Sequence, residues 1–377
     1  MPYLIVFSTG SESSSESKNS LLVVLGEIVT TSMPVGLSSS RNDSVQPRSA
    51  NLAAHLSGNP TLDLADVAYT LAMGRRQLSH RRVVVARDHA DAVALLTGQE
   101  PTRVGTIAAD SSDPTVVYMF PGGGSQYARM CLDLYEGEIA FKSALDECFE
   151  IIDRELDRNI RALLFAAPSE AEVATKSLQR PSMSLPTLFA VEYALAKLFD
   201  SYGLKPAAYI GHSMGEYVAA CLAGVFSLRD GLRLVHLRGR LFESTQTGKM
   251  VGVSLSEDAT RALMPKGLSI AAVNAPSLCV ASGPVALVDQ FSKTLTEQEV
   301  DWTPIHIDVA AHSSLLEPIL EEFRRFCRTI DFRAPKTPIA SNLTGRWLSA
   351  AEATDPEYWV KHLRNTCLLY TSDAADE

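Results

Sequence analysis

Several patterns that would each define a class of protein are missing from this sequence. No apolar run is long enough to span a membrane, and the first ten residues lack the basic start and long apolar core of a signal peptide. The six cysteines are scattered without a Cys-x-x-Cys pair, and there is no His-Glu-x-x-His motif. The net charge of −10 provides no basic surface for nucleic acid or anionic lipid. We therefore expect a cytoplasmic protein that binds no metal, no nucleic acid and no membrane.

The 377 residues are enough for two or three domains. Helix-like and strand-like stretches alternate between residues 61 and 98, which indicates a small α+β unit over residues 1–110. A Ser-rich stretch lies near the N-terminus, so we expect residues 12–47 to be disordered or inserted. Residues 100–114 are interpreted as a linker to the next unit.

The second unit begins with an apolar strand at residues 115–120. An amphipathic helix over 184–203, a strand over 205–211 and a helix over 216–226 follow it. This alternation of strand and helix indicates a parallel α/β sheet. Residues from about 249 to 308 differ, because four short strand candidates surround one helix there. That pattern indicates a small α+β subdomain inserted in the larger fold.

Residues 211–215, Gly-His-Ser-Met-Gly, form a G-x-S-x-G motif between the second of these strands and the apolar helix. Small residues on both sides let the chain turn tightly from strand to helix and leave the serine hydroxyl exposed at the corner. The helix N-terminus adds positive potential where an oxyanion would form. The motif occurs by chance in many chains, but its context here favours Ser213 as a nucleophile over an inert serine in a turn.

A serine nucleophile needs a base, and His312 is the favoured candidate. It follows the small subdomain at the start of a predicted helix, where the chain returns to the sheet. His212 is adjacent to Ser213, but its side chain should point away, and we expect His306 to face solvent. No acidic residue stands out as the group that orients the base. Asp308 is nearest in sequence, although a solvated carboxylate is the simpler interpretation.

Two further stretches carry groups that such a reaction would use. The glycines of residues 120–126, FPGGGSQ, would let a backbone N–H act as an oxyanion donor alongside the N–H of Met214. A merely flexible loop fits that stretch equally well. Arg238 and Arg240 lie two apart on a predicted helix and so face different directions. One of them could clamp a carboxylate, although a solvent-exposed position is the default for any single arginine.

Together these stretches resemble the acyltransferase domain of modular type I polyketide synthases, which is related to malonyl-CoA:acyl carrier protein transacylases. The matching segments occur in the family's order between Val116 and Thr366: FPGGGSQY, FAVEYALAKL, GHSMGEYVAACLAGVFSL, LRGRLF, AVNAPSLCVASGP, AAHSSLLEPIL and DPEYWVKHLRNT. Residues 62–86 resemble the linker domain that joins a ketosynthase to this acyltransferase. The resemblance therefore implies an acyltransferase domain over 115–366 and leaves residues 367–377 as an unmatched, dispensable tail.

The resemblance implies a fold and a reaction. The fold is an α/β-hydrolase-like large subdomain with a parallel sheet, a small ferredoxin-like subdomain inserted at about 249–308, and the linker domain before both. The reaction moves a malonyl-type unit from malonyl-CoA to the phosphopantetheine thiol of an acyl carrier protein, through a serine ester and without a bound cofactor. The implied partners are that carrier protein and the neighbouring ketosynthase domain of the same synthase.

The resemblance also implies the catalytic pair. Ser213 matches the nucleophile that carries the acyl group, and His312 matches the general base and acid. In this family a backbone carbonyl or an amide near the end of the domain orients the histidine, which accounts for the missing acid. Asn342 and His362 are our candidates for the residue that supplies this partner.

Five more residues match the family's binding positions. Gly123 and Met214 match the oxyanion-hole backbone donors. Arg238 matches the arginine that pairs with the free carboxylate of the acyl group. Gln126 and Asn274 match polar positions of the substrate pocket.

The choice of acyl group receives conflicting signals. Met214 follows the nucleophile, where an apolar residue is typical of malonyl-selective members of the family. Residues 309–312 read Val-Ala-Ala-His, and the small Ala311 would by itself admit the extra methyl of methylmalonyl. Phe242 is our candidate for filling that space. We therefore predict malonyl.

Two other functions remain open at this point. A serine hydrolase, such as a thioesterase or lipase, would use a late acid followed by a histidine near the chain end, and it would give no reason for Arg238. A catalytically silent fragment of a megasynthase is the alternative from a different class, which the unmatched ends of the chain make conceivable.

Overall fold

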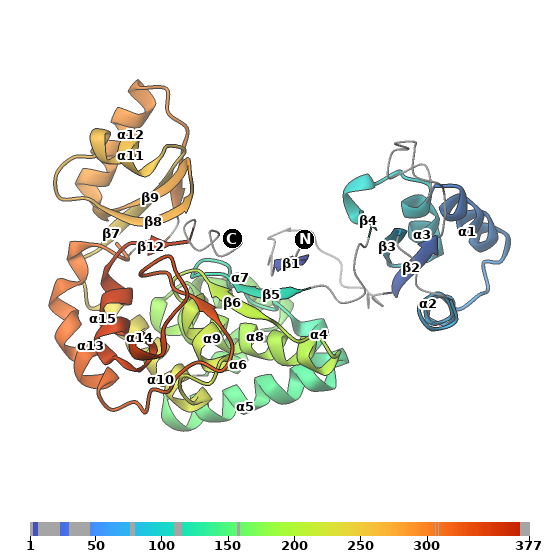
Figure 1. The fold of residues 1–377 in the computed structure, drawn as a ribbon, viewed down its shortest axis with the longest axis horizontal. Helices are drawn as coiled ribbons and strands as arrows, with labels where there is room; N and C mark the ends of the chain where they lie inside the picture. The colour runs from blue at the N-terminus through green and yellow to red at the C-terminus, as the bar shows by residue number, and fades with distance from the viewer. Residues whose placement is uncertain are drawn as a thin grey trace. The chain divides into compact units, whose positions relative to one another are not determined.

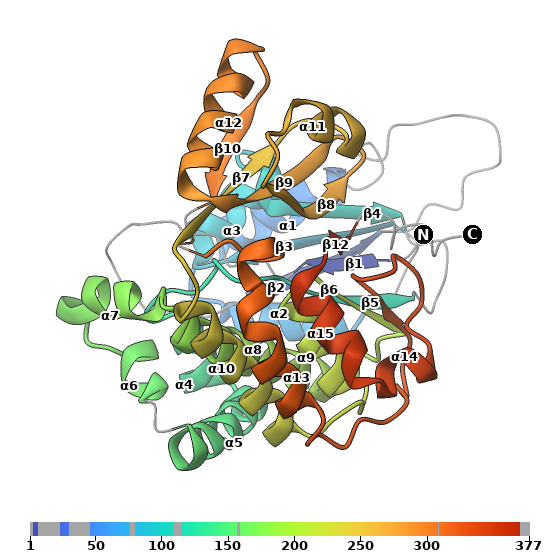
Figure 2. The same cartoon turned by 90° about the vertical axis from the view of Figure 1, so that its left-hand side faces the viewer.

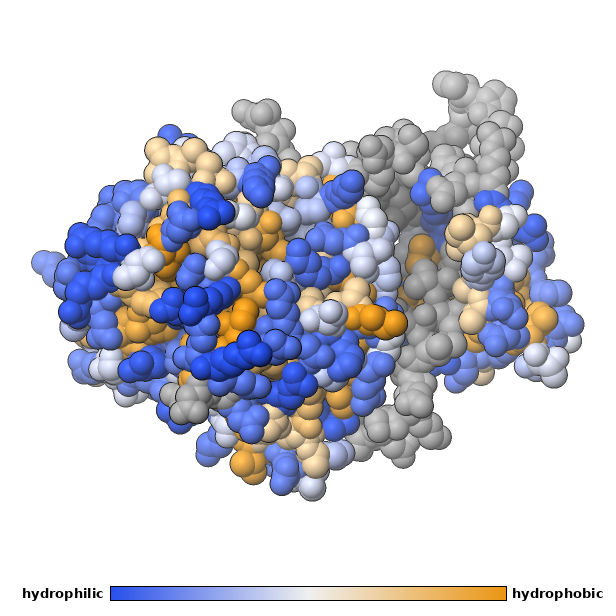
Figure 3. Space-filling view, turned by 90° about the horizontal axis from the view of Figure 1, so that it is seen from below, coloured by the Kyte–Doolittle hydropathy of each residue, from blue (hydrophilic) through white to orange (hydrophobic). Residues whose placement is uncertain are grey.

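The computed structural model describes residues 3–6, 23–29, 46–75, 80–108, 115–156, 159–305, 307 and 309–369. It divides into two units, residues 13–114 and residues 1–12 together with 115–377 (Figure 1). Among the described residues, no helix combines the length and the apolar character needed to cross a membrane. The face drawn in Figure 3 is mainly hydrophilic, with apolar residues in scattered patches.

The smaller unit is an antiparallel sheet with the strand order β2–β3–β4. Its elements are β2 (Val23–Val29), α1 (Gln46–Gly58), α2 (Leu64–Met73), β3 (His80–Ala86), α3 (His89–Leu96), a 3-10 helix (Pro101–Arg103) and β4 (Val104–Ala108). Leu56 of α1, Val84 of β3 and Leu95 of α3 are buried together in its core. They meet because alternate residues of β3 face the helices.

Two strands of this unit lie in segments without a predicted strand. β2 falls within residues 12–47, which we expected to be disordered or inserted, yet it pairs with β3 along its whole length. β4 falls within the expected linker and pairs with the opposite edge of β3. Both strands obtain their hydrogen bonds from β3, and such nonlocal pairing leaves little signal in the segment itself.

The larger unit contains a parallel sheet with the order β1–β5–β6–β11. Its strands are β1 (Tyr3–Val6), β5 (Val116–Phe120), β6 (Ala208–Gly211) and β11 (Ile339–Ala340). The predicted parallel α/β sheet is therefore confirmed. The placement of residues 3–6 corrects our boundary, because we assigned them to the unit over 1–110 and they pair with β5 instead.

Helices connect and cover these strands (Figures 1 and 2). They are α4 (Leu132–Gly137), α5 (Ile139–Glu155), α6 (Ile160–Leu164), a 3-10 helix (Pro168–Glu170), α7 (Ala171–Leu178), α8 (Pro181–Ser201), α9 (Gly215–Leu222), α10 (Leu228–Glu243), a 3-10 helix (Ser314–Ile319), α13 (Leu320–Cys327), α14 (Ala350–Thr354) and α15 (Pro356–Arg364). α8 packs against α5 and α10 and buries Leu188, Val191 and Leu198 of its predicted apolar stripe.

The small subdomain has the chain order expected of a ferredoxin-like fold. It consists of β7 (Gly248–Val253), α11 (Glu257–Leu263), β8 (Ser269–Ala275), β9 (Leu278–Pro284), α12 (Val285–Glu297) and β10 (Trp302–Ile305). Its sheet order is β10–β7–β9–β8, and every neighbouring pair among these four is antiparallel. Figures 1 and 2 show α11 and α12 on the face of this sheet that is turned away from the large subdomain.

The C-terminal segment corrects another boundary, since we expected residues 367–377 to lie outside the domain. β12 (Cys367–Leu368) adds a parallel strand beside β8, and the Cys367 side chain is buried. The Leu368 N–H donates to the carbonyl oxygen of Asn342 at 2.7 Å, and the Leu369 N–H donates to that of Val273 at 3.1 Å. Residues 367–369 therefore connect the small subdomain to the large one, while residues 370–377 lie outside the described part of the chain.

Candidate active site

The G-x-S-x-G motif forms the turn between β6 and α9, and its two glycines are required by close backbone contacts. A Cβ atom on Gly211 would lie 2.1 Å from the Glu216 nitrogen, and one on Gly215 would lie 2.2 Å from the Phe120 oxygen. Between them Ser213 has a φ of +52°, a left-handed conformation that is uncommon for a residue with a side chain. The turn is thus strained at the predicted nucleophile.

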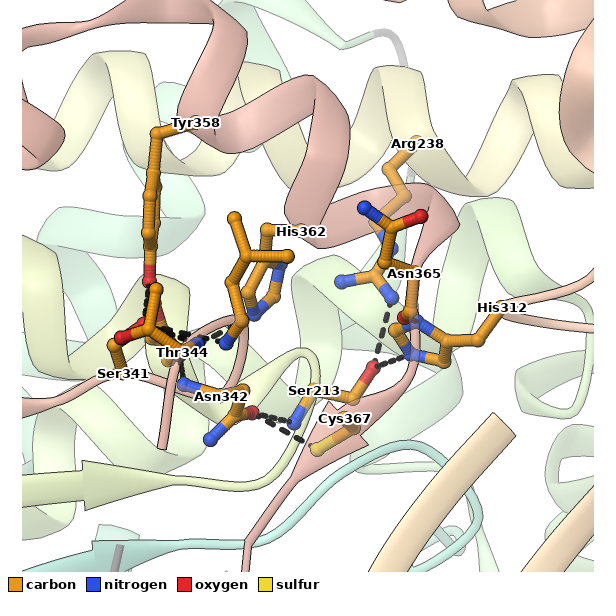
Figure 4. Close-up of polar contacts among 12 residues, drawn as sticks. Ser213, Arg238, His312, Ser341, Asn342, Thr344, Tyr358, His362, Asn365 and Cys367 are labelled. Atoms are coloured by element: carbon orange, nitrogen blue, oxygen red, sulfur yellow. Dashed lines mark hydrogen bonds and ion pairs between the residues drawn. The ribbon is translucent and has the colours of Figure 1, made fainter. Parts of the chain in front are cut away.

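His312 lies beside the serine hydroxyl (Figure 4). Its Nε2 is 2.7 Å from the Ser213 Oγ, and its Nδ1 is 2.7 Å from the backbone oxygen of Asn365. Because a carbonyl oxygen only accepts, Nδ1 carries the proton and Nε2 is free to accept the serine proton. The orienting group is therefore the Asn365 carbonyl, and our candidates Asn342 and His362 were wrong for this role.

The protonation state of His312 follows from its surroundings. Burial lowers the pKa of His312 well below its ordinary value, and the nearby positive charge of Arg238 lowers it further. The Asn365 carbonyl opposes this shift, because it stabilises the protonated ring. His312 is consequently neutral at neutral pH, which is the state that a general base requires.

Arg238 comes from α10 and is the third group at the serine. Its side chain is 1% exposed, and its Nη2 donates to the Ser213 Oγ at 2.8 Å. Its Nε and Nη1 have no hydrogen-bond partner within the described residues. The aromatic rings of Tyr217 and Phe242 lie 5.2 Å from its Cζ atom. Burial lowers the pKa of Arg238, but a guanidinium stays charged even so, and it therefore presents an incompletely paired cation beside the nucleophile.

The remaining predicted site residues lie around this centre. Gln126 accepts a hydrogen bond from the Gly124 N–H at 3.0 Å, so it shapes the loop that contains Gly123. Asn274, on β8 of the small subdomain, is 2.9 Å from the Nε2 of His212. The His212 ring is therefore engaged away from the serine, whereas His306 and Asp308 lie outside the described residues.

Three more predicted residues border the same centre. Met214 is buried at the start of α9, directly after the serine. Ala311 is half-buried and directly precedes His312. Phe242 is buried one helical turn after Arg238 on α10.

Sequence reasoning missed a set of buried polar residues beneath the serine (Figure 4). The side-chain oxygen Oδ1 of Asn342 accepts the Ser213 N–H at 2.6 Å. The Asn342 N–H in turn donates to Glu216 at 2.6 Å, and the Tyr358 hydroxyl donates to the other oxygen of that carboxylate. Glu216 carried a signal, because a glutamate directly after the motif and within an apolar helix indicates a buried carboxylate with a structural partner.

The fold and the Ser213–His312 pair place the chain in the class of α/β acyl-transfer enzymes. A sequence model of the family described as "Acyl transferase domain" matches residues 117–374. The chain therefore belongs to the acyl transferase domain family of polyketide synthases. Residues 35–96 match a second model, described as "CurL-like, PKS C-terminal", which begins inside the segment that we expected to be inserted or disordered.

Individual relatives agree with this assignment. A phenolphthiocerol/phthiocerol polyketide synthase of Mycobacterium tuberculosis (strain CDC 1551 / Oshkosh) is 36% identical over 323 residues, which cover 83% of this chain. The chain spans about a fifth (21%) of that relative. The solved acyl transferase domain of ZmaA is 36% identical with a TM-score of 0.80, and the match covers 96% of this chain and 81% of that one. The acyl transferase domain of SpnD, solved with 2-(pent-4-yn-1-yl)malonyl, is 34% identical with a TM-score of 0.77, covering 94% and 81%.

Proposed function

We propose that this acyltransferase moves a malonyl group from malonyl-CoA to the phosphopantetheine thiol of an acyl carrier protein, with Ser213 as the carrier. The observation that carries the proposal is Arg238. Its guanidinium is buried, touches the serine hydroxyl, and has two N–H-bearing atoms without partners among the described residues. A buried cation with free donors is complementary to a carboxylate, and the free carboxylate of malonyl lies close to the reacting thioester.

In the first half-reaction the Ser213 Oγ attacks the thioester carbonyl while the His312 Nε2 takes its proton. The resulting oxyanion is held by the backbone N–H groups of Gly123 and Met214. As the intermediate collapses, the carbon–sulfur bond breaks, and CoA leaves as a thiol with the proton from His312. The product is a malonyl ester on Ser213.

The second half-reaction runs the same steps with a different nucleophile. His312 takes the proton of the phosphopantetheine thiol, and the sulfur attacks the serine ester. The ester bond breaks, and the Ser213 Oγ regains its proton from His312. The Asn365 carbonyl keeps the ring in the tautomer that both steps need, since it accepts only from Nδ1.

Two observations favour transfer over hydrolysis. His312 is oriented by a backbone carbonyl, whereas a typical serine hydrolase uses an acid for this purpose. Arg238 would have no purpose in an enzyme whose substrates lack a carboxylate. The hydrolase and the silent fragment therefore become outcomes of the test below.

Phe242 supports malonyl rather than methylmalonyl. Its ring lies 5.2 Å from the Arg238 Cζ atom and is therefore close to where the substrate carboxylate would bind. A large side chain there offsets the space that Ala311 leaves open. One methyl group in an apolar pocket changes selectivity by only about 1–3 kcal/mol, so some methylmalonyl transfer is expected. A competition between the two CoA esters, with the adduct mass as the readout, tests this choice.

The proposed partners follow from the family and the chain length. The matched relative is a polyketide synthase of which this chain spans about a fifth (21%). We propose that an acyl carrier protein receives the malonyl group and that a ketosynthase domain of the same synthase precedes the smaller unit, residues 13–114.

Mass spectrometry after mixing with malonyl-CoA tests the proposal. We expect a stable malonyl adduct that peptide mapping assigns to Ser213, that Ser213→Ala abolishes, and that a phosphopantetheinylated carrier protein removes. Rapid release of free malonate without an adduct would identify a hydrolase. An unchanged protein mass would identify a catalytically silent fragment.

A further inference from the structure

The turn that carries Ser213 is held by a buried side chain from a distant part of the sequence. We propose that Asn342 is a positioning residue, which fixes the nucleophile in its left-handed conformation by accepting the Ser213 N–H. This inference rests on the proposed role of Ser213 as the nucleophile. It adds a residue outside the Ser213–His312–Arg238 centre on which the reaction depends.

The contact geometry is specific to the Asn342 oxygen. Asn342 is 1% exposed, and its Oδ1 accepts the Ser213 N–H at 2.6 Å and the Cys367 Sγ–H at 3.1 Å. Its Nδ2 has no partner within the described residues. The amide is therefore used through its oxygen alone, and that oxygen satisfies a backbone donor that would otherwise be buried and unpaired.

Asn342 is itself fixed on both sides of its backbone. Its N–H donates to the Glu216 Oε2 at 2.6 Å, and its carbonyl oxygen accepts the Leu368 N–H at 2.7 Å. Glu216 is completely buried and also accepts from the Tyr358 hydroxyl, which lies 2.6 Å from the Ser341 Oγ. Hydrogen bonds of this kind are strengthened by the low dielectric constant of a buried site.

These contacts form a closed connection around the nucleophile. Glu216 lies on α9, which begins directly after the Ser213 turn, so it moves with that turn. It holds Asn342, and Asn342 holds Ser213. A strained backbone conformation persists only where its surroundings determine it, and this connection supplies the constraint.

Loss of the Asn342 oxygen should therefore displace the reacting atom without removing any substrate contact. The turn would relax towards an ordinary φ, and the Ser213 Oγ would move away from the His312 Nε2, which is now 2.7 Å distant. A displacement of about 1 Å at a reacting group costs roughly 100-fold in rate. The Arg238 side chain is unaffected, so KM for malonyl-CoA should change little.

The experiment compares Asn342→Ala, Asn342→Asp and Thr344→Val with the wild type. Asn342→Asp keeps an oxygen at the acceptor position and replaces only the unpartnered nitrogen. Thr344→Val is the matched control, because Thr344 is in the same turn and its buried hydroxyl has no partner among the described residues. The main readout is the rate at which a fluorophosphonate probe labels Ser213, because this reaction needs no malonyl group. Circular dichroism and the unfolding temperature report the fold, and malonylation kinetics give kcat and KM separately.

We expect Asn342→Ala to lower the labelling rate and the malonylation kcat by about 10- to 100-fold, with KM within about threefold of wild type. Asn342→Asp should recover most of both rates, and Thr344→Val should match the wild type. Labelling of folded Asn342→Ala within about threefold of wild type would overturn the inference. So would a folded Asn342→Asp that is as slow as Asn342→Ala, because the acceptor oxygen would then be irrelevant. A wild type that the probe labels elsewhere would instead reject Ser213 as the nucleophile.

Discussion

Replacing Arg238 by alanine gives the most direct test of how the site selects its substrate. The guanidinium makes two separable contributions. Its Nη2 donates to the Ser213 Oγ at 2.8 Å whatever the acyl group, whereas its Nε and Nη1 are available only to a substrate that carries a second carboxylate. Acetyl-CoA lacks that group and leaves these buried donors unpaired, so the wild type should discriminate strongly against it.

The magnitude follows from the lost contact. A charge-assisted hydrogen-bonded pair contributes about 1.5–3 kcal/mol, which corresponds to a factor of roughly 10 to 150 in rate. Arg238→Ala should lower kcat/KM for malonyl-CoA by at least this factor. The loss of the bond to Ser213 affects both substrates equally and cancels in their ratio. The malonyl:acetyl ratio of kcat/KM should therefore fall by about 10- to 150-fold.

The assay measures acyl-enzyme formation by mass and CoA release with each ester separately. Arg240→Ala is the matched control, because Arg240 lies on the same helix but its side chain is exposed. It removes the same charge from the chain and should leave the ratio unchanged. A malonyl:acetyl ratio in Arg238→Ala that equals the wild-type ratio would refute the carboxylate clamp.

Three further outcomes follow from the structure. The pKa of His312 is lowered by burial and by Arg238, so Ser213 acylation should stay constant as the pH falls through about 6.5, the ordinary histidine value, and decline only below it. The unfolded chain binds a proton there that folded His312 refuses, so stability should also fall with decreasing pH, and an acylation midpoint at or above 6.5 would contradict this. Gly215→Ala places a Cβ atom 2.2 Å from the Phe120 oxygen and should lower the unfolding temperature sharply, whereas Gly137→Ala has nothing within 4 Å and should not; equal unfolding temperatures would contradict the packing. Truncation after Thr366 should lower both the unfolding temperature and acyl transfer, since it removes β12 and the Leu368 bond to Asn342; full activity would show that this segment is dispensable after all.

The sequence alone determined the features that depend on local chain geometry. The G-x-S-x-G motif identified Ser213 because a tight strand-to-helix turn requires glycine at both flanks, and the structure shows backbone atoms within 2.2 Å of where their Cβ atoms would be. The alternation of strands and helices likewise predicted the parallel sheet and the inserted small subdomain. Each of these signals lies within a short segment, where periodicity and glycine positions report the backbone directly.

Only the tertiary structure decided which distant groups meet at the serine. The group that orients His312 is a backbone carbonyl, and every residue has one, so no residue type could mark Asn365. Arg238 and Arg240 were equivalent in sequence until the packing of α10 buried the first and left the second exposed. Asn342 reaches Ser213 across a separation of 129 residues. Such contacts depend on how the elements pack in three dimensions, which the local pattern of a single sequence does not encode.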